Sequence, residues 1–218
     1  FKIGHQMVEM IREHEKVSKK EAWNKAVEAL KLVGIPEAEK RMDAYPHELS
    51  GGMCQRVIIA MAVCGHPKLI IADEPTTALD VTIEAQILEI IKELKEKFNT
   101  AIMLITHNFG LVAEVADRIG IMYAGEMVES GDVFEIFENP THPYTRLLMQ
   151  ALPRNTKKEG RLQTIDGSVP RITEKKPGCR FANRCPYAKE ICKTEDPAII
   201  TVGENHICRC HLAGKEEK

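Results

Sequence analysis

Three short segments carry residue types suited to binding and hydrolysing a phosphate group. The apolar run 69–72 ends in Asp73 and Glu74, so a buried strand would deliver two adjacent carboxylates to the edge of a sheet where such folds bind ligands. Upstream, residues 50–52 (Ser-Gly-Gly) stand at a predicted helix start, where free backbone N–H groups bind an anion. His107 follows the next apolar run. The chemistry indicated is the hydrolysis of a bound phosphate compound.

The cysteines indicate a second kind of site. The chain has seven, and five of them lie between residues 179 and 210: Cys179, Cys185, Cys192, Cys208 and Cys210. In a cytosolic chain, cysteines are reduced or metal-bound more often than disulfide-paired. The spacing is not the Cys-x2-Cys of zinc ribbons, whereas four thiolates in one small unit suit a [4Fe–4S] cluster. Zinc and disulfide pairing stay open as alternatives. The other histidines are interpreted as surface or packing residues, although His206 and His211 are available to support a zinc site.

Composition indicates an ordinary globular chain. Of the 218 residues, 28% are charged and 44% hydrophobic. The net charge of −2 does not favour nucleic acid as a main partner. No apolar run approaches the roughly 20 residues of a membrane span, and residues 1–6 do not resemble a secretory signal.

Alternating apolar runs and helical periodicity predict an α/β sheet with helices on both faces. Ser18 and Glu21 have the spacing of a capping box. The predicted elements are helices within 1–48, a buried helix at 57–63, buried strands at 69–72 and 101–105, helices at 81–98 and 110–116, a strand at 118–123 and a hairpin partner at 126–130.

The composition changes after residue 140, which indicates four parts. We predict a helical subdomain at 1–48, the main α/β core at 49–140, a helix and extended connector at 141–178, and a Cys-rich tail at 179–218. The tail is too short and too poor in large apolar residues to bury a core unaided.

Taken together, the run 49–56, the strand that ends in Asp73 and Glu74, and the position of His107 resemble the signature loop, Walker B strand and switch histidine of ABC-transporter ATPases. Met53 in the signature, the His-Pro-Tyr-Thr run at 142–145 and the Cys-rich tail are similar to the ATP-binding subunits of dipeptide/oligopeptide importers. The resemblance implies a P-loop NTPase fold: a helical subdomain plus a RecA-like half sheet, with a small C-terminal extension.

The resemblance also implies roles for individual residues. Glu74 would orient or deprotonate the attacking water, and His107 would bind the γ-phosphate. Asp73 would hold Mg²⁺ through its water shell, and Asp80 ends a segment like the D-loop at the dimer interface. The residues assigned to ATP and Mg²⁺ are Ser50, Gly51, Gly52, Met53, Gln55, Asp73 and Asp80.

For the tail, the resemblance implies a [4Fe–4S] cluster, with Zn²⁺ as the alternative. Residues 178–185 fit the pattern Gly-Cys-x-Phe-x-x-Arg-Cys of the importer subgroup. The implied ligands are Cys179, Cys185, Cys192 and Cys210. Cys208 stands where the pattern has an apolar residue, and it stays open as a substitute for Cys210.

No Gly-x-x-x-x-Gly-Lys-Ser/Thr phosphate loop occurs in the chain, and no Q-loop glutamine is found. We therefore expect a fragment that begins at the helical subdomain and, alone, binds ATP poorly.

The whole protein is expected to hydrolyse ATP at the cytoplasmic face of the membrane and to energise peptide uptake. Its expected partners are a second ATPase subunit, transmembrane permeases and, indirectly, an external solute-binding protein, but no nucleic acid. Three alternatives stay open: a nickel or oligosaccharide importer, an ATPase of the same fold in nucleic-acid repair or translation, and a non-catalytic iron–sulfur regulatory module.

Overall fold

The computed structural model describes residues 1–77, 79–152, 165–170 and 177–214. These residues form two compact units, Phe1–Asn108 and Phe109–Lys218, and each is described by itself.

The first unit is mainly helical. Ser18 begins α2 with the predicted capping box: Glu21 N donates to Ser18 Oγ at 3.2 Å, and Ser18 N donates to Glu21 Oε2 at 2.9 Å. The core includes Met7, Leu30 and Ile87, all completely buried. The helices of this unit are α1 (Ile3–His14), α2 (Lys19–Leu32), α3 (Ala38–Arg41), a 3₁₀ turn (Pro46–Glu48), α4 (Gly51–Cys64) and α5 (Val81–Phe98).

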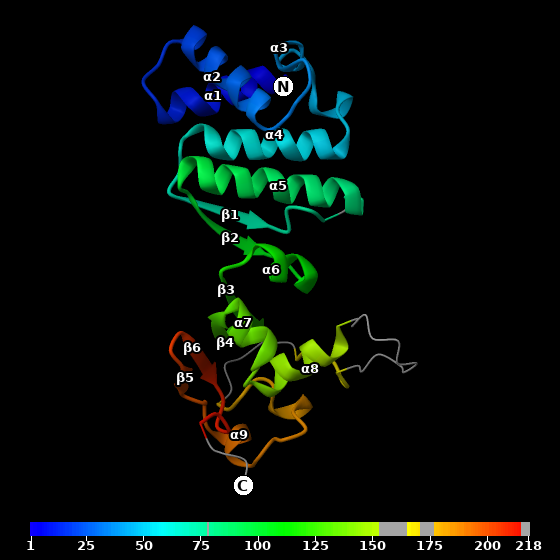
Figure 1. Ribbon diagram of the computed structural model, residues 1–218, viewed down its shortest axis with the longest axis vertical. Helices are drawn as coiled ribbons and strands as arrows, with labels where there is room; N and C mark the ends of the chain where they lie inside the picture. The colour runs from blue at the N-terminus through cyan, green and yellow to red at the C-terminus, as the bar shows by residue number, and fades with distance from the viewer. Residues whose placement is uncertain (78, 153–164, 171–176, 215–218) are drawn as a thin grey trace. The chain divides into compact units, whose positions relative to one another are not determined.

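Two parallel strands complete this unit. β1 (Leu69–Asp73) pairs in register with β2 (Ala101–Ile105), and α5 lies between α4 and this strand pair (Figure 1). The prediction that both strands are buried is wrong. Ile71 and Met103 expose 60% and 51% of their surface, because alternate residues of each strand face away from the helices and no described element covers them. The helix predicted as buried at 57–63 is also half-exposed, with Ile58 58% exposed.

The second unit is built on an antiparallel sheet of order β3-β4-β6-β5. The predicted hairpin is confirmed: Ala124 and Gly125 have φ of +47° and +81°, as a tight two-residue turn between twisted strands requires. The elements of this unit are α6 (Phe109–Val115), β3 (Arg118–Tyr123), β4 (Glu126–Asp132), α7 (Val133–Glu138), α8 (Pro143–Ala151), a 3₁₀ turn (Ala182–Arg184), α9 (Ile191–Thr194), β5 (Ile199–Gly203) and β6 (His206–Arg209).

The Cys-rich tail shares its core with the rest of this unit. β6 pairs with β4, so that Cys208 lies opposite Glu129. Phe181 is almost completely buried, with its ring centroid 5.1 Å from that of Tyr123 on β3 and 5.3 Å from that of Tyr144 on α8. The tail is too small to bury a core alone, and it is thus packed into the larger core of this unit. The four-part division stays a prediction, and most of the predicted connector at 154–178 lies outside the described residues.

Among the helices that the structure describes, none combines the length and apolar character needed to cross a membrane.

Gly4 in α1 provides a test of this packing. A Cβ there would lie 2.7 Å from Met42 O and 2.9 Å from the Trp23 ring, whereas a Cβ on Gly65 would meet nothing within 4 Å. We expect Gly4→Ala to lower the free energy of unfolding by about 1–3 kcal/mol through overpacking and Gly65→Ala to change it little. Chemical denaturation followed by circular dichroism measures both, and equal stabilities would contradict the packing described.

Candidate functional site

Glu74 sits at the carboxyl end of β1 in an unusual backbone conformation. Its φ is +45°, in the left-handed region that costs a non-glycine residue free energy. Its N–H donates to Ile105 O at 2.9 Å, which extends the β1–β2 pairing by one bond. The strand pair therefore fixes the point from which the Glu74 side chain leaves the sheet.

Two side chains hold the Glu74 carboxylate. Thr77 Oγ1 donates to Oε2 at 2.8 Å, and His107 Nδ1 lies 3.0 Å from Oε1. The hydrogen bond from Thr77, and then that from His107, lower the pKa of Glu74 below its usual value. Glu74 is therefore an ionised, solvent-accessible acceptor in contact with the predicted switch histidine.

The Ser-Gly-Gly segment forms the start of α4, as predicted. Ser50 is the N-cap, and Met53 N donates to its Oγ at 3.4 Å. A Cβ on Gly52 would lie 2.8 Å from Cγ2 of Ile83 on α5, whereas a Cβ on Gly51 would lie no closer than 3.8 Å to any other side chain. Gly52 thus allows close approach of α5, whereas the space beside Gly51 is open.

The other predicted nucleotide-site residues occupy two places. Asp80 caps α5 by accepting from Ile83 N at 3.0 Å. Gln55 and Asp73 line a mainly apolar cavity of about 260 Å³ between α4, α5 and the strand pair. The structure thus brings Glu74 together with His107, and Asp73 together with Gln55.

Four of the five tail cysteines line one small pocket in the second unit: Cys179, Cys185, Cys192 and Cys210. Cys179 N donates to Cys192 O at 2.7 Å, which joins two of the segments that carry them. Cys208 is not among the residues that line this pocket and lies fully buried against β4. All seven cysteines are free thiols, which does not favour the disulfide alternative.

The chemistry of these thiols suits a positively charged group. Burial raises the pKa of Cys179 to about 11 and also raises those of Cys185 and Cys210. Neighbouring cysteines raise the pKa of Cys179 further, because thiolates facing one another repel. A bound metal would offset both effects, so the donor set fits one. Nevertheless, no group of three or more His, Cys, Asp or Glu side chains within the described ranges is arranged to hold a metal ion. The predicted metal site is therefore not confirmed.

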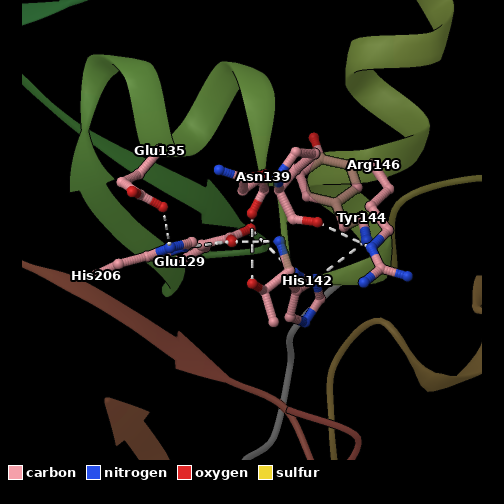
Figure 2. Close-up of polar contacts among 9 residues, drawn as sticks. Glu129, Glu135, Asn139, His142, Tyr144, Arg146 and His206 are labelled. Carbon is pink, nitrogen blue, oxygen red and sulfur yellow. Dashed lines mark hydrogen bonds and ion pairs between the residues drawn. The ribbon is translucent and has the colours of Figure 1, made fainter. Parts of the chain in front are cut away.

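A buried polar network beside this pocket was not predicted (Figure 2). The carboxylate of Glu129 on β4 accepts from Thr141 N at 2.6 Å and His142 N at 3.0 Å, and lies 2.7 Å from His206 Nε2 on β6. His206 Nδ1 lies 3.5 Å from Glu135. Glu129 and His206 are almost completely buried. No local sequence signal indicates this network, because Glu129 and His206 are 77 positions apart.

Comparisons with known proteins extend this description. Residues 3–77 match the family model described as ABC transporter, and residues 128–192 match that described as the C-terminal region of oligopeptide/dipeptide transporters. The chain is 48% identical over 217 residues to the dipeptide transport ATP-binding protein DppD of Haemophilus influenzae. It is 50% identical over 214 residues to the oligopeptide transport ATP-binding protein AppD of Bacillus subtilis. The chain belongs to the ABC transporter family. The resemblance seen in its signature, Walker B strand and tail is thereby confirmed.

The relatives are longer than this chain. The matches cover 100% and 98% of the chain but 66% and 65% of these two relatives, slightly less than two thirds of each. A chain from a solved ABC transporter, described as of metal-chelate type and inward-facing, matches with a TM-score of 0.59 and 22% identity. That match covers 70% of this chain and 59% of the other. The ABC ATPase fold is thus shared, as predicted.

The Glu129 network generates a prediction for the second unit. Glu129→Gln removes the charge and turns an amide N–H₂ toward backbone N–H donors, so we expect a loss of about 3–5 kcal/mol in the free energy of unfolding. Glu135→Gln, at the half-exposed carboxylate on the other side of His206, should cost less than about 1 kcal/mol. Urea denaturation compares the two variants, and equal losses would contradict the network as drawn.

Proposed function

We propose that this chain forms part of the ATP-binding subunit of an ABC importer that takes up dipeptides or oligopeptides. The contact of an ionised Glu74 with His107 at the carboxyl end of β1 carries the proposal. The names of the relatives, which are dipeptide and oligopeptide transport ATP-binding proteins, support peptides over nickel or oligosaccharides as the solute.

In the proposed reaction, water attacks the γ-phosphorus of ATP, Glu74 accepts the proton from that water, and ADP leaves with its bond to the γ-phosphorus broken. Asp73 would hold Mg²⁺, whose charge would stabilise the negative charge that develops on the phosphate, and His107 would donate to the γ-phosphate. Residues 50–52 present hydroxyl and backbone N–H groups to the ATP of a second subunit, and the helix that begins there adds its dipole. Asp80 lies at that same interface.

The subunit would act at the cytoplasmic face of the membrane, as a dimer of ATPase subunits bound to permeases and, through them, to an external solute-binding protein. The alternative from another class is a non-catalytic iron–sulfur regulatory module. ATP hydrolysis that is lost when Glu74 is substituted would support the importer ATPase over the regulatory module.

Glu74→Gln in the full-length protein is the direct test. The amide keeps the shape of the side chain but cannot accept the proton, so we expect turnover to fall at least 100-fold with little change in ATP affinity. Glu89→Gln, at an exposed position of α5, is the matched control and should leave both unchanged. ATPase assays and nucleotide titration measure the two quantities. An equal loss of binding and turnover would count against the general-base role.

We further propose that Cys179, Cys185, Cys192 and Cys210 hold a [4Fe–4S] cluster, with zinc as the alternative group. The shared pocket and the absence of Cys208 from its lining support this ligand set. When bound, the metal would contribute to the folding free energy of a tail that shares its core with β3 and α8.

Two serine variants test the ligand set, because Cys208 and Cys210 are both buried near the end of the chain. Cys210→Ser should lose most of the bound iron or zinc, whereas Cys208→Ser should retain it. Neither should move the ATP dissociation constant of the full-length protein. Elemental analysis after anaerobic purification gives the metal content, and loss of metal in Cys208→Ser with retention in Cys210→Ser would refute the assignment.

A further inference from the structure

His142, the first residue of the His-Pro-Tyr-Thr run, has one nitrogen occupied and one free of partners. It is the N-cap of α8, and its Nδ1 accepts from Tyr144 N at 3.1 Å. The ring is 1% exposed, and its Nε2 is buried with no hydrogen-bond partner among the described residues. A buried polar atom without a partner is rare and calls for an explanation, such as a bound group that accepts a hydrogen bond from it.

The capping hydrogen bond fixes which nitrogen carries the proton. A ring nitrogen that accepts from a backbone N–H uses its lone pair and has no proton of its own. The protonated ring would carry a proton on both nitrogens, so an accepting Nδ1 means that the ring is neutral. A neutral ring with an accepting Nδ1 must carry its proton on Nε2. His142 is therefore a buried N–H donor in need of an acceptor.

The same ring lines the pocket formed by the four cysteines. His142, Phe181 and Cys179, Cys185, Cys192 and Cys210 all contribute to its lining. The ring centroid of His142 lies 6.0 Å from that of Phe181, which stands two residues after Cys179. The backbone of His142 is in turn fixed by Glu129, because its N–H donates to that buried carboxylate at 3.0 Å. The donor thus borders a pocket whose other polar side chains are the four cysteines and His211, and Nε2 of His211 already lies 3.0 Å from Glu195 O.

We propose that His142 donates its Nε2–H to a sulfur atom of the metal group held by Cys179, Cys185, Cys192 and Cys210. The inference rests on the proposed cysteine site and adds a positioning and tuning residue to it. A hydrogen bond to a thiolate or sulfide withdraws electron density from the sulfur, stabilises the more negative reduced state and raises the reduction potential. In a zinc site the same bond would stabilise a thiolate ligand.

Two variants separate the donor from the helix cap. His142→Asn keeps an oxygen near the position of Nδ1 to cap α8 but has no atom at the position of Nε2. His142→Gln places an amide N–H near the position of Nε2 but gives up the short capping acceptor. For the iron–sulfur form, redox titration followed by visible absorbance should give His142→Asn a lower midpoint potential at unchanged iron and sulfide content. His142→Gln should remain near the wild type. An unchanged potential in fully loaded His142→Asn would overturn the inference.

Histidine ¹⁵N NMR on the wild-type protein provides a readout that does not depend on the folding of variants or on the identity of the metal. We expect the Nε2–H tautomer at His142 and a shift of its N–H signal when the metal is removed with a chelator. An Nδ1–H tautomer, or a signal that does not respond to metal removal, would overturn the inference while leaving the cysteine site intact. Wild-type protein that contains neither iron nor zinc would instead refute the proposed cysteine site, and this inference with it.

Discussion

The second unit depends on a single buried carboxylate. Glu129 is almost completely out of water, and such a charge is tolerated only where donors surround it. Those donors come from the turn before α8, through the backbone N–H groups of Thr141 and His142, and from His206 on β6. The carboxylate therefore holds a strand, a turn and the C-terminal strand to one another. Cys210 follows directly on that strand, so the network also helps to position one of the four cysteines of the pocket.

In the first unit, helix caps, a close helix contact and a backbone hydrogen bond position the reactive groups. Helix caps at Ser50 and Asp80 fix where α4 and α5 begin, and the close approach of Ile83 to Gly52 holds the two helix starts together. Glu74 leaves the sheet from a strained backbone position that the bond to Ile105 stabilises. The result is an ionised carboxylate beside a histidine, an arrangement suited to proton acceptance from water rather than to structural support alone.

Features encoded within a few residues were predictable from sequence. The capping box at Ser18, the long helix Val81–Phe98 and the tight turn at Ala124 all follow from local spacing or turn chemistry. Features that depend on contacts between distant segments could not be predicted from the sequence. The run Leu69–Asp73 is as apolar as a strand buried on both faces, yet one face is exposed, and sequence alone cannot say what covers it. The contact between Glu129 and His206 joins residues 77 positions apart, so no local pattern indicates it.

The cysteine pocket lies between these cases. The sequence clusters the thiols, the family pattern implies Cys210 over Cys208, and the fold places Cys210 but not Cys208 in the pocket lining. The central proposal is that Cys179, Cys185, Cys192 and Cys210, which line one pocket, hold one metal group. X-ray absorption spectroscopy at the iron and zinc edges, on wild-type protein purified without air, tests it most directly. The account predicts a first coordination shell made of sulfur alone. A shell dominated by nitrogen or oxygen, or protein free of both metals, would contradict it.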